Sequence, residues 1–248
     1  MKVSIVSVVL NCRDYIGDCI LSVIGQDYSE IEYIVIDGGS TDGTLDVIQQ
    51  YQDRIHVFIT QKDQGFYDGL NKGIALATGD IIGILNADDM IAEPGTISMV
   101  VRCFATTLCG GVYGNLEYTD RKNIRRVVRS WRPGDFRLER LKRGWMPPHP
   151  TLYLYKELYG RCGNYSMDFG TSADYEFILR LFSMYGTSMV YIDHLLVKMR
   201  KGGMSNAGMK PFLLACIYDY RSLVLHRFRW PVLVTICKKL RKIKQFFY

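Results

Sequence analysis

Two adjacent carboxylates, Asp88 and Asp89, directly follow a short apolar run and are well placed to do chemistry. The run, residues 81–85, has four branched apolar side chains, which is typical of a strand buried on both faces. Open α/β sheets bind ligands beyond the carboxyl ends of their strands. Neighbouring carboxylates repel each other, and a hard divalent cation held together with substrate phosphates relieves that repulsion. The pattern predicts a metal–phosphate site here, with an acidic turn that caps the next helix as the alternative.

The segments before the acid pair alternate between β-rich runs and stretches with helical spacing of apolar residues. Repeated strand–helix units predict a mostly parallel sheet with right-handed crossovers. Because parallel strands end at the same edge of a sheet, Asp37, Asp63 and Asp88 are expected to line one crevice. The expected strands before the acid pair are 3–10, 33–36 and 56–60.

The second half of the chain is less regular. A loop with three prolines around His149 precedes a β-rich run, and Asp174 falls in the first turn of an expected helix with Ser172 as its cap. A glycine-rich loop at 202–206 leads to two C-terminal helices separated by Pro231. Strands are expected at 111–118, 123–131 and 151–155, and helices at 133–143 and 172–185.

The net charge of +6 is unevenly distributed along the chain. Residues 121–143 contain ten Lys or Arg against two acids, and residues 221–248 contain eight and no acid. The remaining residues are strongly acidic. A basic tail on an acidic body indicates an anionic partner, which is either a membrane surface or a nucleic acid.

The seven cysteines are odd in number and form no C-x-x-C pair, which favours scattered thiols in a reducing compartment over disulfides or a zinc site. The first residues carry no signal-peptide pattern, and the longest stretch without a charged residue, 103–116, is too short and too rich in Gly and Thr for a membrane span. We therefore expect a cytoplasmic protein without a transmembrane helix.

In order and spacing these motifs resemble the pattern of glycosyltransferase family 2. The resemblance extends over residues 2–206 and implies a GT-A fold, a Rossmann-like arrangement in the α/β class. It also implies a nucleotide-sugar donor, a divalent cation (Mn²⁺ or Mg²⁺) and transfer with inversion. The matching residues are Asn11, the D-G-G-S-T-D-G-T run at 37–44, D-Q-G at 63–65, N-K-G at 71–73, N-A-D-D at 86–89, His149, A-D at 173–174 and G-G-M-S at 202–205.

The resemblance also implies roles for individual residues. Asp88 would hold the metal on the diphosphate, while Asn86 stands where the family's D-x-D element usually has its first acid. Asp174 would be the catalytic base. His149 is a candidate to line the acceptor site, and a structural histidine held by the surrounding prolines is the alternative. The residues implied to bind the nucleotide-sugar are Asn11, Asp37, Asp63, Asn71, Asn86, Asp88, Gly202, Gly203 and Ser205.

The tail supplies a possible membrane contact. Val232, Ile236, Leu240, Ile243 and Phe247 share one face of the last helix, and lysines and arginines cover the others, as in an interfacial helix. A helix that packs on the protein is the alternative.

We therefore expect a GT-A domain over 1–206, with 1–115 binding the nucleotide-sugar and 116–206 the acceptor, and basic C-terminal helices over 207–248. The protein would sit on the inner face of the plasma membrane through 231–248 and move a hexose, with a UDP-sugar as the expected donor, to a lipid-diphosphate-linked saccharide for surface polysaccharide. The alternatives are a sugar nucleotidyltransferase, for which the expected glycine-rich triphosphate loop is missing, and a nucleic-acid-binding protein, which would not explain the acidic strand ends.

Overall fold

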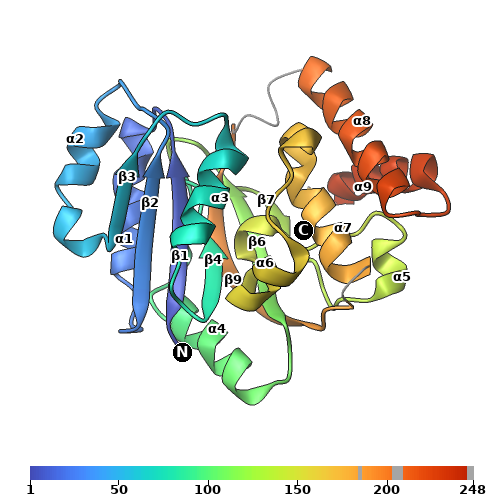
Figure 1. Ribbon diagram of the computed structural model, residues 1–248, viewed down its shortest axis with the longest axis horizontal. Helices are drawn as coiled ribbons and strands as arrows, with labels where there is room; N and C mark the ends of the chain where they lie inside the picture. The colour runs from blue at the N-terminus through green and yellow to red at the C-terminus, as the bar shows by residue number, and fades with distance from the viewer. Residues whose placement is uncertain (184–185, 203–208, 245–248) are drawn as a thin grey trace.

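The computed structural model describes residues 1–183, 186–202 and 209–244. Helices cover a nine-stranded sheet of order β3-β2-β1-β4-β8-β6-β9-β5, with β7 paired to β6 (Figure 1). The strands are β1 (Val3–Val9), β2 (Ile31–Asp37), β3 (Val57–Thr60), β4 (Ile81–Ile84), β5 (Met90–Ile91), β6 (Gly111–Thr119), β7 (Val127–Trp131), β8 (Tyr153–Tyr155) and β9 (Met189–Arg200). The α-helices are α1 (Arg13–Ile24), α2 (Thr44–Gln49), α3 (Phe66–Leu76), α4 (Thr96–Thr106), α5 (Leu138–Leu141), α6 (Lys156–Cys162), α7 (Ala173–Ser183), α8 (Met209–Leu225) and α9 (Pro231–Lys244).

The first four strands form the parallel part of the sheet. β1 lies between β2 and β4, and β3 pairs with the outer side of β2, all in parallel register. The strand ends that precede Asp63 and Asp88, and the end of β2 at Asp37, therefore share one edge, as the sequence predicts. This edge is at the top of Figure 1.

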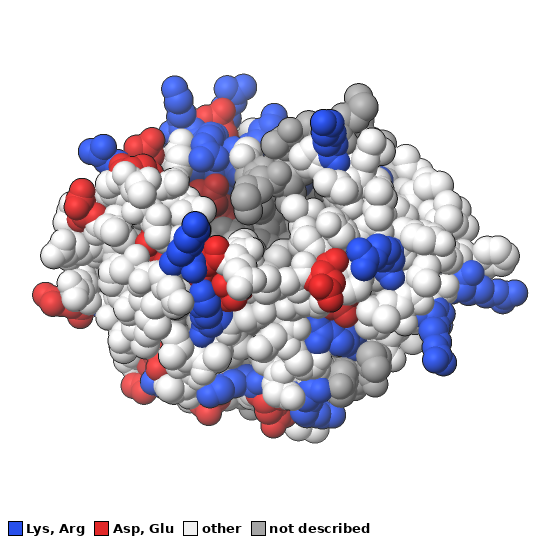
Figure 2. All heavy atoms as spheres, turned by 45° about the horizontal axis from the view of Figure 1, so that its top comes forward, with Lys and Arg blue, Asp and Glu red and all other residues white. Residues whose placement is uncertain are grey.

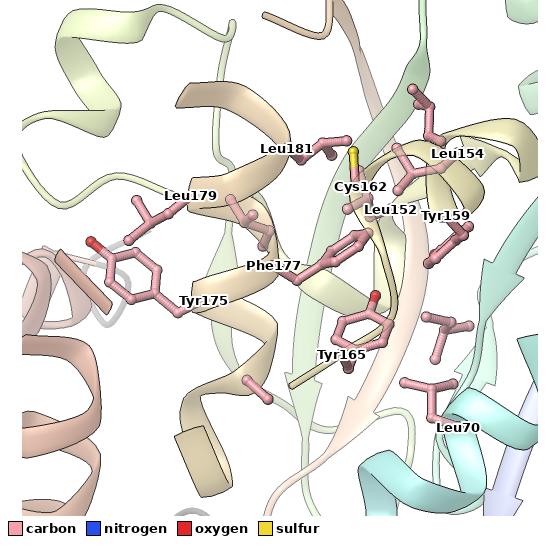
Figure 3. Packing of buried hydrophobic residues seen from close by; sticks show 14 of the residues in the cluster. Leu70, Leu152, Leu154, Tyr159, Cys162, Tyr165, Tyr175, Phe177, Leu179 and Leu181 are labelled. Carbon is pink, nitrogen blue, oxygen red and sulfur yellow. The ribbon is translucent and has the colours of Figure 1, made fainter. Parts of the chain in front are cut away.

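Both faces of this parallel part are buried because successive side chains of each strand point to opposite sides. Ile34 and Ile36 of β2 pack in a core with α3, α6 and α7, whereas Tyr33 and Val35 pack in a second core with α1, α2 and α4. In the first core Tyr165 lies against Phe177 of α7, with 4.5 Å between their ring centroids (Figure 3). The near-continuous apolar runs of the sequence reflect this double burial.

Close contact between α3 and the sheet depends on glycine. A Cβ on Gly73 would lie 2.3 Å from Cγ1 of Val6, so no larger residue fits between α3 and β1 without displacing one of them. α3 ends at Leu76 with Ala77 as its cap residue, so Gly79 lies beyond the helix. Gly79 instead packs against β1, where an added Cβ would come within 2.7 Å of Ser4 Oγ.

The second half of the sheet is mixed, so the expected mostly parallel sheet holds only for its first half. β8 pairs antiparallel with both β4 and β6, and β7 forms the expected antiparallel pair with β6. The long strand β9 was not predicted, because most of its residues are only partly buried and charged residues interrupt its apolar pattern. It runs parallel to β6 along its full length, and this distant pairing stabilises it.

Of the two C-terminal helices, α8 packs on α7 and on the 3₁₀ segment Met167–Ser172, and α9 packs on α8. Ser172 does not act as the predicted helix cap, because its hydroxyl donates a hydrogen bond to the Ala215 carbonyl of α8. α9 is joined to α8 through Asp219, which accepts hydrogen bonds or ion pairs from Lys238 at 2.7 Å and Lys239 at 2.9 Å. In the part of the chain that the structure describes, no helix has the length and apolar character needed to span a membrane.

Candidate active site

The two carboxylates after β4 have different surroundings. Asp89 is fully buried and accepts hydrogen bonds from the Asn86 amide at 2.7 Å and from the Arg200 backbone N–H at 3.1 Å. Burial, together with the charge of Asp88, raises the pKa of Asp89 well above its ordinary value. Asp89 therefore holds the turn to the end of β9, and Asp88 is the member of the pair that a ligand can reach.

Asp88 faces two arginines. Its side chain is 24 % exposed, and one carboxylate oxygen lies 3.6 Å from Nη1 of Arg121 in the connection between β6 and β7. Its backbone carbonyl accepts a 2.7 Å hydrogen bond from Nη1 of Arg200. Figure 2, which turns this edge toward the viewer, shows acidic and basic side chains gathered around it. The strand end is thus a mixed-charge site in which cationic groups surround one accessible carboxylate.

The loop after β2 is held by two residues that were expected to bind the nucleotide-sugar. Asp37 is fully buried, and its carboxylate accepts hydrogen bonds from the backbone N–H groups of Gly39 and Ser40 and from the Thr60 hydroxyl. Asn11 accepts a 2.9 Å hydrogen bond from the Thr41 N–H. Both side chains shape the loop, so the geometry supports an indirect role for them at the nucleotide.

Asp63, unlike Asp37, has a carboxylate that the described residues around it do not fully satisfy. One carboxylate oxygen pairs with Lys72 at 2.5 Å, while the other, Oδ2, is buried and has no hydrogen-bond partner among the described residues. This oxygen points at Gly38 and Gly69, where added Cβ atoms would lie 3.2 and 2.6 Å away. An unsatisfied buried acceptor between two glycines is a cradle for a ligand N–H or O–H.

Asn71 does not contribute to this cradle. Its amide donates to the Tyr165 carbonyl at 2.9 Å and accepts from the Tyr165 N–H at 3.0 Å, so both of its polar atoms are used to join α3 to a distant loop. The geometry therefore gives Asn71 a structural role, and the predicted contact with the nucleotide-sugar has no support in it.

Asp174 lies at the start of α7 among aromatic and polar side chains. Its N–H donates to the Tyr67 hydroxyl at 3.3 Å, and its Oδ1 accepts from the Tyr175 N–H at 2.7 Å. Burial, and next the negative charge of Asp174, raise the pKa of Tyr67. His149 is within electrostatic reach as well, and its Nε2 lies 2.8 Å from the Tyr165 hydroxyl. The structure thus brings together Asp174 and His149, which are 25 positions apart in the sequence.

Tyr118 of β6 connects the two acidic regions. The guanidinium of Arg129 lies 3.5 Å from the centre of its ring. Burial raises the pKa of Tyr118, Arg129 opposes the shift, and the charges of both Asp89 and Asp174 add to it. The carboxylate beside the end of β4 and the one at the start of α7 therefore both act electrostatically on this one ring.

The glycine-rich loop is described only at its start. Gly202 has a φ of +116°, a conformation that favours glycine, and an added Cβ would lie 3.4 Å from Nη1 of Arg121. The backbone there approaches the arginine beside Asp88. The predicted contacts of Gly203 and Ser205 lie outside the described residues.

Sequence reasoning missed Tyr67, Tyr118, Arg121 and Arg200 as members of this site. Tyr67 lies 107 positions from Asp174, and Arg200 lies 112 positions from Asp88. Nothing local marks these residues, and only the pairing of β6 with β9 brings the two arginines to the end of β4. The charge excess of residues 121–143 was the one available signal, and it does not single out Arg121.

The donor groups fit a cation that a substrate helps to hold. Among the described residues no group of three or more His, Cys, Asp or Glu side chains is placed to hold a metal ion. Asp88 supplies one accessible carboxylate, and Mg²⁺ in proteins is commonly held by one or two carboxylates together with substrate phosphates. Asp88 and a diphosphate would share such an ion, and Asn86, whose amide nitrogen is bonded to Asp89, is adjacent.

The chain belongs to glycosyl transferase family 2, because the sequence model of that family matches residues 4–164. The sheet and its covering helices form a GT-A fold, and the protein is a glycosyltransferase. This finding replaces both alternatives, the sugar nucleotidyltransferase and the nucleic-acid-binding protein.

Individual relatives agree with the assignment. The chain is 28 % identical over 250 residues to a PGL/p-HBAD biosynthesis glycosyltransferase of Mycobacterium bovis, covering 97 % of this chain and 95 % of the relative. It resembles the structure of residues 1–349 of S. aureus TarS with UDP-GlcNAc (TM-score 0.72, 16 % identity, 90 % of this chain and 67 % of that one), and it spans 39 % of a longer TarS structure. It also resembles a mannosyltransferase of Pyrobaculum calidifontis with GDP-Man and Mn²⁺ (TM-score 0.64, 18 % identity, 95 % and 69 % coverage).

Proposed function

We propose that the protein is an inverting transferase that moves a hexose from a UDP-sugar to a lipid-diphosphate-linked saccharide in surface polysaccharide synthesis. The observation that carries this proposal is that Asp89, the neighbour of Asp88, and Asp174 both act electrostatically on the same side chain, Tyr118 of β6. Inversion needs a base on one face of the sugar and a stabilised leaving group on the other. A single site that holds both groups meets this requirement.

The cradle at Asp63 supports a nucleotide donor. Uracil offers one N–H that a carboxylate can accept, and the buried Oδ2 of Asp63 has no partner among the described residues. Gly38 and Gly69 let the Asp63 carboxylate lie close to their backbone, because side chains there would collide with it. Leaving such an acceptor unsatisfied costs about 1–3 kcal/mol, which a bound base would recover.

Asp88 and the two arginines are suited to the diphosphate. A bound divalent cation supplies Lewis-acid stabilisation of the leaving phosphate. Asp88 would orient this cation, and Arg121 and Arg200, which lie next to Asp88, would add positive charge beside the phosphate. Nucleoside diphosphates and metals found in structurally similar transferases are consistent with this arrangement.

Asp174 is the proposed base. Its Oδ1 accepts the Tyr175 N–H, and the Tyr67 hydroxyl lies beside it, so the carboxylate is held in one orientation at the edge of the acceptor side. A carboxylate placed in this way removes the proton of the acceptor hydroxyl as the new bond forms and contributes about 10²- to 10⁴-fold in rate.

Thermal unfolding with UDP, GDP, TDP and CMP, each with and without Mn²⁺, tests the donor class. We expect stabilisation by UDP that increases with Mn²⁺ and that is weakened in Asp88→Ala, because binding to the folded state raises its stability by mass action. A matched variant, Asp53→Ala, which removes an exposed carboxylate from the 3₁₀ segment Gln52–Arg54, should respond as the natural protein does. Stabilisation by another nucleotide alone would refute the uridine assignment, and no response to any of them would refute the donor site.

The acceptor proposal rests on the surface of α8 and α9. A groove of about 610 Å³ runs between the two helices, and its walls are almost entirely apolar. The end of the molecule that carries these helices shows a broad uncharged surface bordered by Lys and Arg (Figure 2). Such a surface fits the interface of an anionic bilayer, where lipid-linked acceptors lie. The exposed apolar residues are Phe212, Leu213, Leu214, Ile217, Tyr220, Val224, Leu225, Trp230, Val232, Leu233, Ile236 and Leu240.

The structure corrects one part of the membrane prediction. Lys238 and Lys239 were expected among the basic side chains on the other faces of the last helix that hold it to a membrane, but they are only 11 % and 17 % exposed and pair with the buried Asp219. The contribution of Ile243 and Phe247 lies outside the described side chains. α8, which was not part of the prediction, supplies more of the apolar surface than α9 does.

Sedimentation with vesicles that contain phosphatidylglycerol tests the membrane contact. The double variant Ile217→Glu/Ile236→Glu should remain in solution, because each carboxylate would enter an apolar, negatively charged interface. Leu108→Glu is the control, since Leu108 is an exposed apolar residue that does not belong to α8 or α9. Equal sedimentation of both variants would refute the proposed surface.

A further inference from the structure

Two arginines flank Asp88, and one of them is fixed in place. Arg200 is nearly buried, forms an ion pair with Asp18, and donates to the Asp88 carbonyl. Its backbone N–H is bonded to Asp89, and its guanidinium lies 4.9 Å from the centre of the Tyr15 ring. Arg200 is therefore a fixed structural part of the site, and its positive charge is a permanent feature of it.

Arg121 is held much more loosely. Its side chain is 44 % exposed, and its 3.6 Å approach to the Asp88 carboxylate is too long for a hydrogen bond. Its other contact is with the face of Tyr15, 4.6 Å from the ring centre. Arg121 thus neutralises Asp88 electrostatically without being fixed to it.

The position of Arg121 also places it beside the expected diphosphate. Its Nη1 lies 3.4 Å from the point where a Cβ on Gly202 would stand, so the guanidinium sits between Asp88 and the start of the glycine-rich loop. A guanidinium binds phosphate oxygens in a fork geometry, and it requires only a side-chain rotation to do so from an exposed position.

We propose that Arg121 is an exchangeable cation: it neutralises Asp88 in the free protein and moves to the donor diphosphate when a divalent cation occupies Asp88. This inference rests on the proposed function, because it assumes a diphosphate at the end of β4. Asp88 presents one accessible carboxylate, and a metal ion and a guanidinium on it repel each other. The diphosphate that arrives with the metal supplies the second anion, so that both cations are satisfied.

The proposal predicts two effects of opposite sign when Arg121 is removed. Without nucleotide, Arg121→Gln should bind Mn²⁺ about 2- to 5-fold more tightly, since a competing exposed ion partner of Asp88 is gone. With Mn²⁺ present, the same variant should bind UDP about 10- to 100-fold more weakly, since a charge-assisted contact to phosphate is lost. A residue that only maintained the loop would weaken both.

The test measures Mn²⁺ binding from the electron paramagnetic resonance signal of the free ion, and UDP binding by calorimetry in excess Mn²⁺. Arg121→Lys should keep part of the UDP affinity, and Arg125→Gln, an exposed arginine on the same connection, should change neither constant. A parallel loss of both affinities in Arg121→Gln, or no change in either, would overturn the proposal.

The two arms separate this inference from the proposed function. Failure of the natural protein to bind UDP would refute the donor site, and the Mn²⁺ arm would still decide whether Arg121 competes at Asp88. Normal binding of UDP by both the natural protein and Arg121→Gln would refute only the role of Arg121.

Discussion

Replacing Asp174 with Asn removes the proposed base while preserving its structural contact. The side-chain oxygen of Asn can still accept the 2.7 Å hydrogen bond from the Tyr175 N–H, so we expect α7 to begin as it does now. The lost carboxylate should lower kcat by about 10²- to 10⁴-fold. Since each tenfold change corresponds to about 1.4 kcal/mol, the barrier should rise by roughly 2.7–5.5 kcal/mol.

The assay follows release of UDP from the UDP-sugar that stabilises the protein, with a lipid extract as the acceptor source, and measures UDP binding separately by calorimetry. UDP affinity should stay within about twofold, because Asp174 makes none of the proposed nucleotide contacts. Asp168→Asn is the control: its carboxylate is exposed and lies six positions earlier on the segment before α7. Turnover by Asp174→Asn comparable to that of Asp168→Asn would refute the assignment of the base.

Two further predictions concern stability. Burial lowers the pKa of His149. Below about pH 6.5 the unfolded chain therefore binds more protons than the folded one, and the free energy of unfolding decreases as the pH is lowered. This loss of stability is limited to about 1.4 kcal/mol per pH unit and should be smaller in His149→Gln. Urea unfolding at pH 8 and pH 5.5 measures it, and the same pH dependence in the natural protein and in the variant would contradict the prediction. Gly73→Ala should destabilise the protein by about 1–3 kcal/mol, because its Cβ would lie 2.3 Å from Val6 Cγ1. Gly160→Ala, with open space around it, should have a far smaller effect in the same measurement, and a similar loss in both would contradict the packing argument.

The features that the sequence predicted well depend on neighbours in the chain. The end of β4 and its two carboxylates lie within a single stretch of nine residues, so the apolar run and the acids identify both the strand and its carboxyl end. The parallel edge follows from the order of strands and helices, because short right-handed connections allow few alternatives.

The roles of individual residues were harder to predict, because a polar residue in a loop can bind a ligand or hold the loop itself. Asp37 and Asp63 both lie at or after the end of a strand, yet the first accepts hydrogen bonds from three donors in its own surroundings, and the second keeps a buried oxygen with no partner among the residues that the structure describes. The difference arises from the loop conformation and from the two glycines that face Asp63. Residue type and spacing do not reveal this difference between the two carboxylates.

Long-range pairing explains the remaining gaps. β9 lacks a clear alternating pattern, and it forms because β6 is already present to pair with it over nine residues. Arg200 reaches the acid pair only through that strand, and its contacts span more than 100 positions. A cationic partner for Asp88 could be expected from charge alone, but its identity required the fold.

The proposed membrane surface and the proposed base belong to one packed unit. Lys238 of α9 bonds to Asp219 of α8 and lies 3.4 Å from the centre of the Tyr175 ring, next to Asp174 in the chain. Tyr175 and Phe177 leave α7 on different sides, and Tyr175 lies on the side toward α8 and α9 (Figure 3). Deleting α9 would therefore leave Asp219 buried without its two lysines and loosen the start of α7. Loss of activity on such a deletion would follow even with a water-soluble acceptor, so only substitutions at exposed apolar positions can separate membrane binding from the integrity of the base.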